Sequence, residues 1–317
     1  MCGMDRTKGI GICGMTDQMV LARAALHFWE EPCISAESGS GAVFFVGCPM
    51  HCAFCQNQSI ANAENKGFSV VSTERLVQIF FELKEQGANN INLVTADHFI
   101  PSVTAAIKMA KEKGFGLPFI YNTSGYVNVE SLKMLEGLID VYLPDFKYWD
   151  SSLAKDLSKC PDYPAVVKKA ITEMVRQVGQ PVFYKKNKNK ECYTAAEYNE
   201  FEENDFENAE ILIKRGVIVR HLILPEHTND SKEIISYLLD EYGNKIYISI
   251  MNQYTPVISK EMAEKIGHSE LLKRVIDAEY EGVIDYAIER GIENGFIQDG
   301  ETNMESFIPE FDGTGIR

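Results

Sequence analysis

The sequence predicts an α/β fold in which six successive βα units build a mainly parallel sheet. From residue 42 onward, short runs of β-branched and apolar residues alternate with amphipathic helical stretches, and capping residues and glycines separate them. The chain has 317 residues, of which 45% are hydrophobic and 24% charged, so it can bury a large core. Six such units form either an open doubly wound sheet or an incomplete barrel.

Residues 1–40 precede this alternation and are expected to form an N-terminal extension. Apolar residues recur at helical spacing within it, which predicts a helix over Gln18–Trp29 through Leu21, Ala24, Ala25 and Phe28. The extension also holds three thiols. Cys2 and Cys13 enclose a glycine-rich stretch, and with Cys33 they are either part of a second metal site or free thiols. The free-thiol interpretation is favoured because four ligands cannot be counted there.

Residues 41–298 are expected to form the main domain, and residues 299–317 a C-terminal tail. The expected strands are Ala42–Gly47, Asn90–Thr95, Pro118–Asn122, Val141–Asp145, Val217–Leu224 and Lys245–Met251. The expected helices are Thr73–Gln86, Pro101–Lys113, Asn128–Leu138, Ala165–Val178, Lys232–Tyr242 and a long one over Ser269–Arg290. A lysine run and then a glutamate-rich run at about 179–209 interrupt the pattern. This charged insert is interpreted as a solvated face, with partner docking as the alternative.

Ligands of such sheets bind beyond the carboxyl ends of the strands, so the polar residues that follow each strand are the candidate site. In chain order they are Cys48, Cys52 and Cys55; Asp97 and His98; Thr123 and Ser124; Asp145 and Lys147; Glu226 and His227; Asn252 and Gln253. His98 is expected to cap the helix that follows, with proton handling as the alternative.

Three thiols in C-x3-C-x2-C spacing follow the first strand, at Cys48, Cys52 and Cys55. Such a set suits zinc or an iron–sulfur cluster. A structural zinc site and a complete cubane each need four ligands. Three local thiols therefore either recruit a distant ligand or leave one metal position open for chemistry. In the zinc alternative, His51 or a distant cysteine would complete the set.

The composition narrows the function classes. Lys and Arg number 31 against 46 Asp and Glu, which gives a net charge of -15, so a nucleic-acid partner is not expected. No apolar run is long enough to span a membrane, so no membrane partner is expected either. The eight cysteines are even in number, but the first residues lack a secretory leader pattern. We therefore expect a cytoplasmic protein with reduced thiols.

The cysteine spacing, the aromatic Phe54 before the last cysteine and the βα pattern resemble the signature of the radical SAM superfamily. The resemblance implies a partial (β/α)6 TIM-type barrel with an N-terminal extension and a C-terminal helix and tail. It also implies a [4Fe-4S] cluster on Cys48, Cys52 and Cys55, with S-adenosyl-L-methionine on the fourth iron. Reductive cleavage then yields a 5′-deoxyadenosyl radical that abstracts hydrogen. A reducing electron donor of flavodoxin or ferredoxin type is implied as a partner.

Within the superfamily, the chain resembles the pyruvate formate-lyase activating-enzyme-like group, which is related to the glycyl radical enzyme activases. The segments that carry this likeness are Arg23–Ser35, the cysteine loop with Gln56 and Asn57, Arg220–Pro225, Met251–Pro256 and Glu293–Phe296. The resemblance implies a protein substrate from which a backbone glycine hydrogen is removed. The alternatives are radical modification of another peptide or small molecule and, from a different class, a non-catalytic zinc-binding interaction protein.

The resemblance also implies a cofactor pocket, lined by Asp97, Thr123, Ser124, Lys147, Arg220 and Asn252. A lysine and an arginine suit a carboxylate. Two positions depart from the family pattern. Thr95-Ala96-Asp97 replaces a Gly-Gly-Glu that usually holds the methionyl amine, and Asn252 or Gln253 replaces a histidine near the ribose. An amide hydrogen-bonds a hydroxyl but carries no proton, which leaves room for a different substrate.

Overall fold

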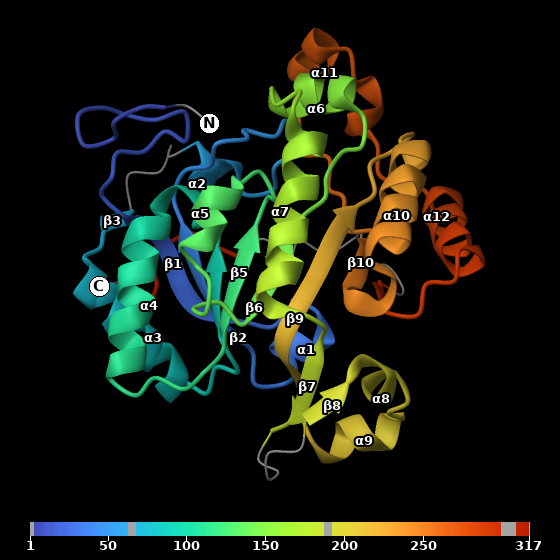
Figure 1. The fold of residues 1–317 in the computed structure, drawn as a ribbon. Helices are drawn as coiled ribbons and strands as arrows, with labels where there is room; N and C mark the ends of the chain where they lie inside the picture. The colour runs from blue at the N-terminus through green and yellow to red at the C-terminus, as the bar shows by residue number, and fades with distance from the viewer. Residues whose placement is uncertain (1–2, 63–67, 187–191, 299–308, 317) are drawn as a thin grey trace.

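All six predicted strands form, and they lie parallel to one another in chain order within one sheet (Figure 1). They are β2 (Ser40–Phe45), β4 (Ile91–Val94), β5 (Phe119–Thr123), β6 (Val141–Pro144), β9 (Ile211–Leu222) and β10 (Tyr247–Met251). A short strand, β11 (Gly295–Ile297), extends the sheet beyond β10. This computed structural model describes residues 3–62, 68–186, 192–298 and 309–316. Within them the sheet is open, and the partial (β/α)6 barrel stays a prediction.

The helix predicted over Gln18–Trp29 is wrong, because this segment forms β1 (Val20–His27). β1 runs antiparallel to β2 and also pairs with the short β3 (Ser69–Val70). The helical spacing of its apolar residues does not mark a buried stripe, since Phe28 at its end is 49% exposed. Backbone pairing with the edge of the sheet therefore overrides the local pattern.

The C-terminal tail lies beside β1. Ala24 N–H donates to the carbonyl oxygen of Thr314 at 2.9 Å, and Gly313 N–H donates to that of Ala22 at 3.1 Å. Arg23 forms an ion pair with Asp312 at 3.0 Å. Residues 299–308 of the predicted tail lie outside the described residues.

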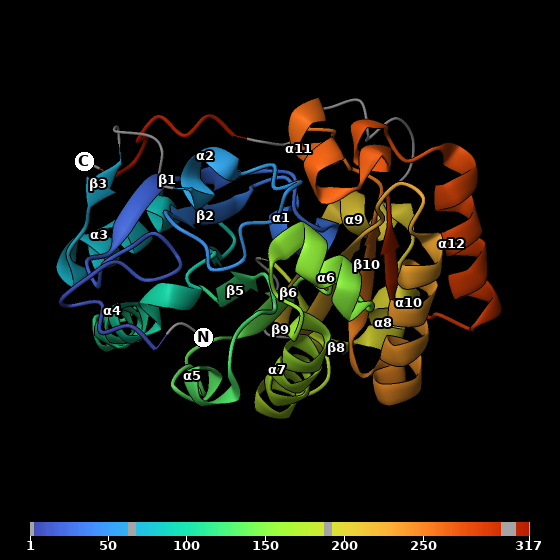
Figure 2. The same ribbon diagram turned by 90° about the horizontal axis from the view of Figure 1, so that it is seen from above.

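Most predicted helices form. They are α3 (Thr73–Glu85), α4 (Ile100–Glu112), α5 (Val129–Lys133), α7 (Tyr163–Val178) and α10 (Thr228–Tyr242). However, α5 ends five residues before its predicted end and α10 begins four residues before its predicted start. Ser72 caps α3 by accepting from Arg75 N–H, and Asn128 caps α5 by accepting from Ser131 N–H. In Figure 2, α4, α5, α7 and α10 lie along one face of the sheet.

The single helix predicted over Ser269–Arg290 is wrong. The structure has a 3-10 turn, η3 (Ser269–Leu272), and a separate helix, α12 (Asp277–Glu289). Lys273 and Ile276 lie between these two elements, and both have an extended backbone conformation. The Glu279 carboxylate accepts from Ile276 N–H at 3.1 Å, so a new helix starts at this point.

Several short elements were not predicted. They are α1 (Pro32–Ser35), α2 (Gln58–Ala61), η1 (Asp97–Phe99), α6 (Ser151–Ser158), η2 (Gly243–Lys245) and α11 (Lys260–Ile266). Among the described residues, no helix has both the length and the apolar character that a membrane crossing requires.

The charged insert folds into a small unit of β7 (Val182–Lys185), β8 (Cys192–Thr194), α8 (Ala195–Asn199) and α9 (Glu203–Asn208). β7 pairs antiparallel with the first half of β9, whereas the second half of β9 pairs with β6 and β10. The unit therefore lies at the end of the sheet opposite the carboxyl ends of the parallel strands (Figure 1). The lysine run at residues 187–190 lies outside the described residues.

Candidate functional site

A cavity of about 220 Å³ lies at the carboxyl ends of the parallel strands. The three loop cysteines line it, as do four of the six residues predicted for the cofactor pocket: Thr123, Ser124, Lys147 and Arg220. The other two, Asp97 and Asn252, are not among the lining residues. Strand ends far apart in the sequence thus contribute to one cavity, as the parallel topology predicts.

The cysteine loop begins at Gly47, whose φ of +91° favours glycine. A Cβ there would lie 2.4 Å from Met15 Cγ and 2.6 Å from the carbonyl oxygen of Cys13. The N-terminal segment therefore packs directly against the start of the loop. His51 contacts the Ile12 carbonyl oxygen through Nε2 at 2.7 Å and Asn62 Oδ1 through Nδ1 at 3.2 Å. Both of its ring nitrogens thus have partners outside the thiol set.

The three thiols are close enough to influence one another. Burial, and then the neighbouring Cys52, raise the pKa of Cys55 to about 11, and the same causes raise the pKa of Cys48 further. The three thiols line one cavity, which suits an iron–sulfur cluster with one metal position left open. His51 does not complete a zinc set with them, because both of its ring nitrogens have other partners.

Helix α6 holds the cysteine loop from outside the cavity. The Ser158 hydroxyl donates to Cys52 Sγ at 3.0 Å, and the buried Tyr148 hydroxyl lies 2.6 Å from Ser158 Oγ. Ala53 N–H donates to the carbonyl oxygen of Leu157 at 2.8 Å. No sequence pattern indicated these contacts, because α6 itself was not predicted.

A network of charged side chains lies beside the thiols. Lys147 Nζ is 2.6 Å from Asp145 Oδ2, and Arg220 Nε is 3.3 Å from Asp145 Oδ1. Arg220 also pairs with Glu30 at 2.9 Å and donates to Asn122 Oδ1 at 2.7 Å. Burial alone would raise the pKa of Asp145, but Lys147 and Arg220 hold it below its usual value. The network therefore stays charged inside the protein.

Glu30 is a site residue that the sequence did not assign. It lines the cavity, pairs with Arg220 and accepts from Asn92 Nδ2 at 2.7 Å. The available signal was Arg220 itself, since an arginine in an apolar strand requires a partner. The partner could not be located, because the segment before Glu30 was predicted as a helix.

Asp97 lies behind the cavity wall. Its Oδ1 accepts from Thr123 Oγ1 at 2.5 Å and from Tyr121 Oη at 2.8 Å, and its buried Oδ2 has no hydrogen-bond partner. Burial raises the pKa of Asp97 to about 6, although the Thr123 and Tyr121 hydrogen bonds oppose this. Asp97 thus holds Thr123, which lines the cavity, in a fixed orientation.

Two residues close to Asp97 in the sequence are His98, whose role differs from the prediction, and Thr95, whose backbone is strained. His98 does not cap the following helix, because its Nε2–H donates to the carbonyl oxygen of Val46 at 2.7 Å. It instead links the β4 loop to the end of β2. Thr95 lines the cavity with a φ of +60°, which is strained for a β-branched residue. Such strain often accompanies a functional site.

At the end of β10, Gln253 takes the place at the cavity wall that was predicted for Asn252. The Asn252 side chain is buried, and its Oδ1 has no hydrogen-bond partner. Gln253 is tied to the cysteine loop, since Gln56 Nε2 donates to its carbonyl oxygen at 2.8 Å.

The N-terminal thiols lie apart from this cavity. Cys13 belongs to the main core and Cys33 to a smaller one, and both are buried. In the described part of the chain, neither joins a compact group of three metal-ligating side chains. Cys2 lies outside the described residues.

Comparison with known proteins adds a family match. A family model described as the radical SAM superfamily matches residues 42–187. An uncharacterized protein of Methanocaldococcus jannaschii is 23% identical over 259 residues, which are 80% of this chain and 64% of that protein. The chain therefore spans less than two thirds of the length of this curated relative.

Two solved structures are also similar to the chain. One is Streptococcus suis SuiB bound to S-adenosylmethionine, with a TM-score of 0.44, 14% identity and coverage of 80% of this chain and 48% of SuiB. The other is methylornithine synthase (PylB), with a TM-score of 0.41, 15% identity and coverage of 79% of this chain and 68% of that protein.

Proposed function

We propose that this chain, whose residues 42–187 carry a radical SAM superfamily domain, is an enzyme that cleaves S-adenosyl-L-methionine reductively. The observation that carries the proposal is that the three thiols of the C-x3-C-x2-C loop line one cavity together with Lys147 and Arg220, and that no fourth thiol lines it among the described residues. Cys48, Cys52 and Cys55 would hold a [4Fe-4S] cluster. When bound, this cluster supplies the electron that generates a 5′-deoxyadenosyl radical.

The charged network suits the amino-acid end of the cofactor. Lys147 and Arg220 provide two cations for a carboxylate, and both line the cavity. Asp145 holds the two cations in place and balances their charge. Glu30, on the other side of Arg220, offers a carboxylate for an ammonium group.

The uncharged residues would position the rest of the cofactor. Thr123 and Ser124 present hydroxyl groups at the cavity wall, and Asp97 orients Thr123 from behind. The Gln253 amide can hydrogen-bond a ribose hydroxyl in the role predicted for Asn252. Asp97 thus acts as a positioning residue.

For the substrate, we propose a backbone glycine of a partner protein, from which the Cα hydrogen is removed. The proposal is supported by the sequence resemblance of Arg23–Ser35 and Met251–Pro256 to the pyruvate formate-lyase activating-enzyme-like group. Glu30 at the cavity wall belongs to the first of these segments. Radical modification of another peptide or small molecule is the alternative.

A reducing electron donor of flavodoxin or ferredoxin type would supply the electron, and we propose that the protein works in the cytoplasm, where thiols stay reduced.

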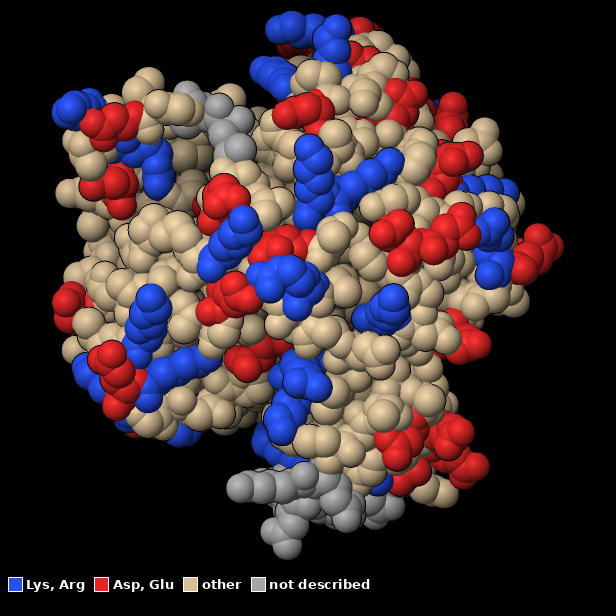
Figure 3. Space-filling model, viewed as in Figure 1, with Lys and Arg blue, Asp and Glu red and all other residues tan. Residues whose placement is uncertain are grey.

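On the face shown in Figure 3, basic side chains are interspersed with acidic ones, and acidic ones gather where α8 and α9 lie. The described part of this face has no continuous basic surface for a phosphate backbone, in agreement with the net charge of -15.

The first experiment tests the cluster. Anaerobic reconstitution with iron and sulfide should give about four irons per chain with a charge-transfer absorbance. Reduction by dithionite in the presence of S-adenosylmethionine should then release 5′-deoxyadenosine. Cys52→Ala should abolish this release, whereas Cys192→Ala, at an exposed free thiol, should leave it unchanged. A colourless protein that retains one zinc ion with sulfur ligands, as seen by X-ray absorption, would instead support the interaction-protein alternative.

The second experiment tests the substrate. The reduced enzyme would be incubated with a co-purified large partner, and a glycine-centred radical would be sought by electron paramagnetic resonance. Its appearance would support the activase role. If 5′-deoxyadenosine forms but no partner ever shows a glycine radical, the small-molecule or peptide alternative takes its place.

A further inference from the structure

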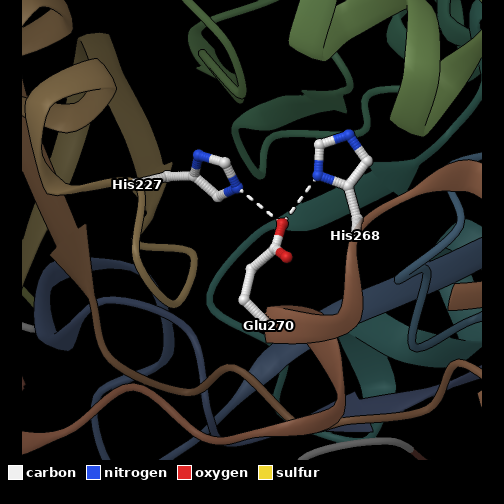
Figure 4. Close-up of side chains that lie close together, drawn as sticks. All are labelled: His227, His268 and Glu270. Atoms are coloured by element: carbon white, nitrogen blue, oxygen red, sulfur yellow. Dashed lines mark hydrogen bonds and ion pairs between the residues drawn. The ribbon is translucent and has the colours of Figure 1, made fainter. Parts of the chain in front are cut away.

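A second polar cluster lies outside the thiol-lined cavity. His227 lies between β9 and α10, His268 follows α11, and Glu270 belongs to η3. Figure 4 shows the two imidazole rings on either side of the Glu270 carboxylate, with both directed at the same oxygen atom. Sequence analysis identified His227 only as a residue that follows a strand. No sequence pattern connected it with His268 and Glu270, some forty positions later.

The distances within this cluster are close to those of a metal site. Glu270 Oε1 lies 3.0 Å from His227 Nε2 and 2.6 Å from His268 Nδ1. One ligand atom from each of the three residues lies within 4.8 Å of the others, and no other group of three among the described residues meets this criterion. Zinc bonds of about 2.0–2.2 Å to nitrogen and oxygen place neighbouring ligand atoms about 3.3 Å apart. Small movements would therefore be enough to admit an ion between the three side chains.

We propose that His227, His268 and Glu270 form a binding site for a zinc-type divalent metal ion. Two imidazoles and one carboxylate are a frequent ligand set for zinc and related transition metals, whereas magnesium and calcium prefer oxygen ligands throughout. The proposal goes beyond the proposed function and does not depend on it, because none of the three residues lines the thiol-lined cavity.

The surroundings of the cluster favour a cation. His227 and His268 line a cavity of about 440 Å³. Five carboxylates line the same cavity, and no lysine or arginine does so in the described part of the chain; the five are Asp150, Asp156, Glu226, Asp230 and Glu233. Such a cavity concentrates cations. It also has room for water, which would fill the coordination positions that three protein ligands leave open.

One of these acids is placed to support a ligand. Asp156 Oδ2 in α6 lies 3.6 Å from His268 Nε2, the ring nitrogen that does not face Glu270. A carboxylate on the far nitrogen of a metal-bound histidine fixes the tautomer and orients the ring.

The positions of the hydrogens on the two imidazole rings are compatible with metal binding. Without the ion, His227 Nε2 and His268 Nδ1 each donate a hydrogen to Glu270. The ion takes the place of these two hydrogens, and each neutral ring carries its hydrogen on the other nitrogen. For His268 that hydrogen then points toward Asp156. The bound ion would join the β9–α10 turn to the segment formed by α11 and η3.

The test uses the full chain with Cys48, Cys52 and Cys55 replaced by Ser, so that the loop thiols cannot bind zinc. Calorimetric titration with zinc should reveal one site per chain. His227→Ala and His268→Ala should each weaken binding by at least the roughly 10–100-fold that is typical for loss of an outer-shell partner. Glu233→Gln removes a carboxylate from the same cavity without touching a ligand, and should change the affinity by less than about 3-fold.

Two further measurements make the outcome decisive. X-ray absorption of the zinc-loaded chain should show nitrogen and oxygen ligands with imidazole scattering; a sulfur shell would overturn the proposal. So would unchanged affinity in both histidine variants, or an equal loss in Glu233→Gln, which would indicate diffuse attraction by the acidic cavity. Circular dichroism checks folding, and Glu270→Gln serves as the second variant if an alanine variant is unfolded. His268→Ala in the otherwise native chain should keep about four irons after reconstitution, so failure of this site leaves the proposed function intact.

Discussion

Both cavities of this protein are lined by residues that follow the carboxyl ends of parallel strands, but they differ in charge. The thiol-lined cavity contains paired charges of both signs, with Arg220 between Glu30 and Asp145 and with Lys147 on Asp145. The other cavity has carboxylates and imidazoles in its wall and, among the described residues, no lysine or arginine. The first arrangement suits an organic ligand that carries both an ammonium and a carboxylate group. The second suits a bare cation.

The difference shows that charge neutralisation within the protein decides what a cavity can accept. In the thiol-lined cavity the protein supplies its own counter-ions, so a ligand must offer matched polar groups to enter. In the acidic cavity Glu226 pairs with Lys273, but no lysine or arginine lines the wall in the described part of the chain, and the other carboxylates leave a net attraction for positive charge. Two changes, Arg220→Met and Glu233→Gln, test this contrast directly, and two more examine the first cavity.

The largest effect is expected from Arg220→Met. Arg220 is 15% exposed and neutralises both Glu30 and Asp145. Its loss leaves the buried Glu30 carboxylate without a cation, whereas Asp145 keeps Lys147. Removing one member of a buried ion pair costs about 3–5 kcal/mol, and the free energy of unfolding in urea should fall by this amount. Arg290→Met, at an exposed pair with Asp240, should cost about 1 kcal/mol or less.

The acidic cavity gives the matching comparison. Glu233→Gln removes a charge from a wall of like charges, so stability in the absence of metal should stay within about 0.5 kcal/mol of the wild type. A large loss in Glu233→Gln, or a small one in Arg220→Met, would contradict the contrast between self-neutralised and unneutralised cavities.

The second effect is the pH dependence of stability that Asp97 causes from behind the wall of the first cavity. The pKa of Asp97 is raised from 3.8 to about 6 by burial, so the native state holds this proton more tightly than the unfolded state. Stability from this group is therefore lost as pH rises from about 4 to about 6. Asp97→Asn removes the titration. The wild type should lose about 2 kcal/mol relative to the variant between pH 4.5 and 7.5, as measured by urea unfolding at each pH.

The difference between wild type and variant is the relevant quantity, because two histidines act in the opposite direction. Burial lowers the pKa values of His27 and His98 to about 4, so their contributions are lost as pH falls from about 6.5 to about 4. These contributions are common to both proteins and cancel. Parallel pH profiles for wild type and Asp97→Asn would contradict the raised pKa.

The smallest effect is expected from Ser158→Ala. Its hydroxyl donates to Cys52 Sγ, and such a hydrogen bond stabilises the more negative, reduced state of a cluster. The variant should bind its full complement of iron but have a more negative reduction potential, as measured by a redox titration followed by electron paramagnetic resonance. Ser151→Ala, at an exposed position of the same helix, should leave the potential unchanged. An unshifted potential in Ser158→Ala would show that this hydrogen bond has no part in cluster tuning.

Much of the fold could be predicted from the sequence, because the six parallel strands are continuous apolar runs that need no information beyond their own residues. β1 could not, since its identity as a strand depends on backbone pairing with β2. The break between η3 and α12 was missed for a similar reason. The Glu279 side chain caps α12, and this signal was hidden inside a continuous helical pattern.

The candidate site could be predicted where a residue with suitable side-chain chemistry also lies within or just after a predicted strand. The cysteines and Lys147 follow predicted strands, Arg220 lies within one, and all of them line one cavity. Asp97 was identified by its position, but only the structure shows that it acts through Thr123. Glu30 and Ser158 were not predicted, because their partners are far away in the sequence.

The C-terminal segment beside β1 has a consequence for the behaviour of the molecule in solution. An exposed edge strand offers unpaired backbone groups to any other chain and is a common starting point for aggregation. Here β3 pairs with the first residues of β1, and Gly313 and Thr314 bond to the residues that follow. The tail thus shields this edge from intermolecular strand addition. Because Pro309 of the same segment lines the thiol-lined cavity, one short stretch of chain both protects the edge of the sheet and contributes to the wall of the site.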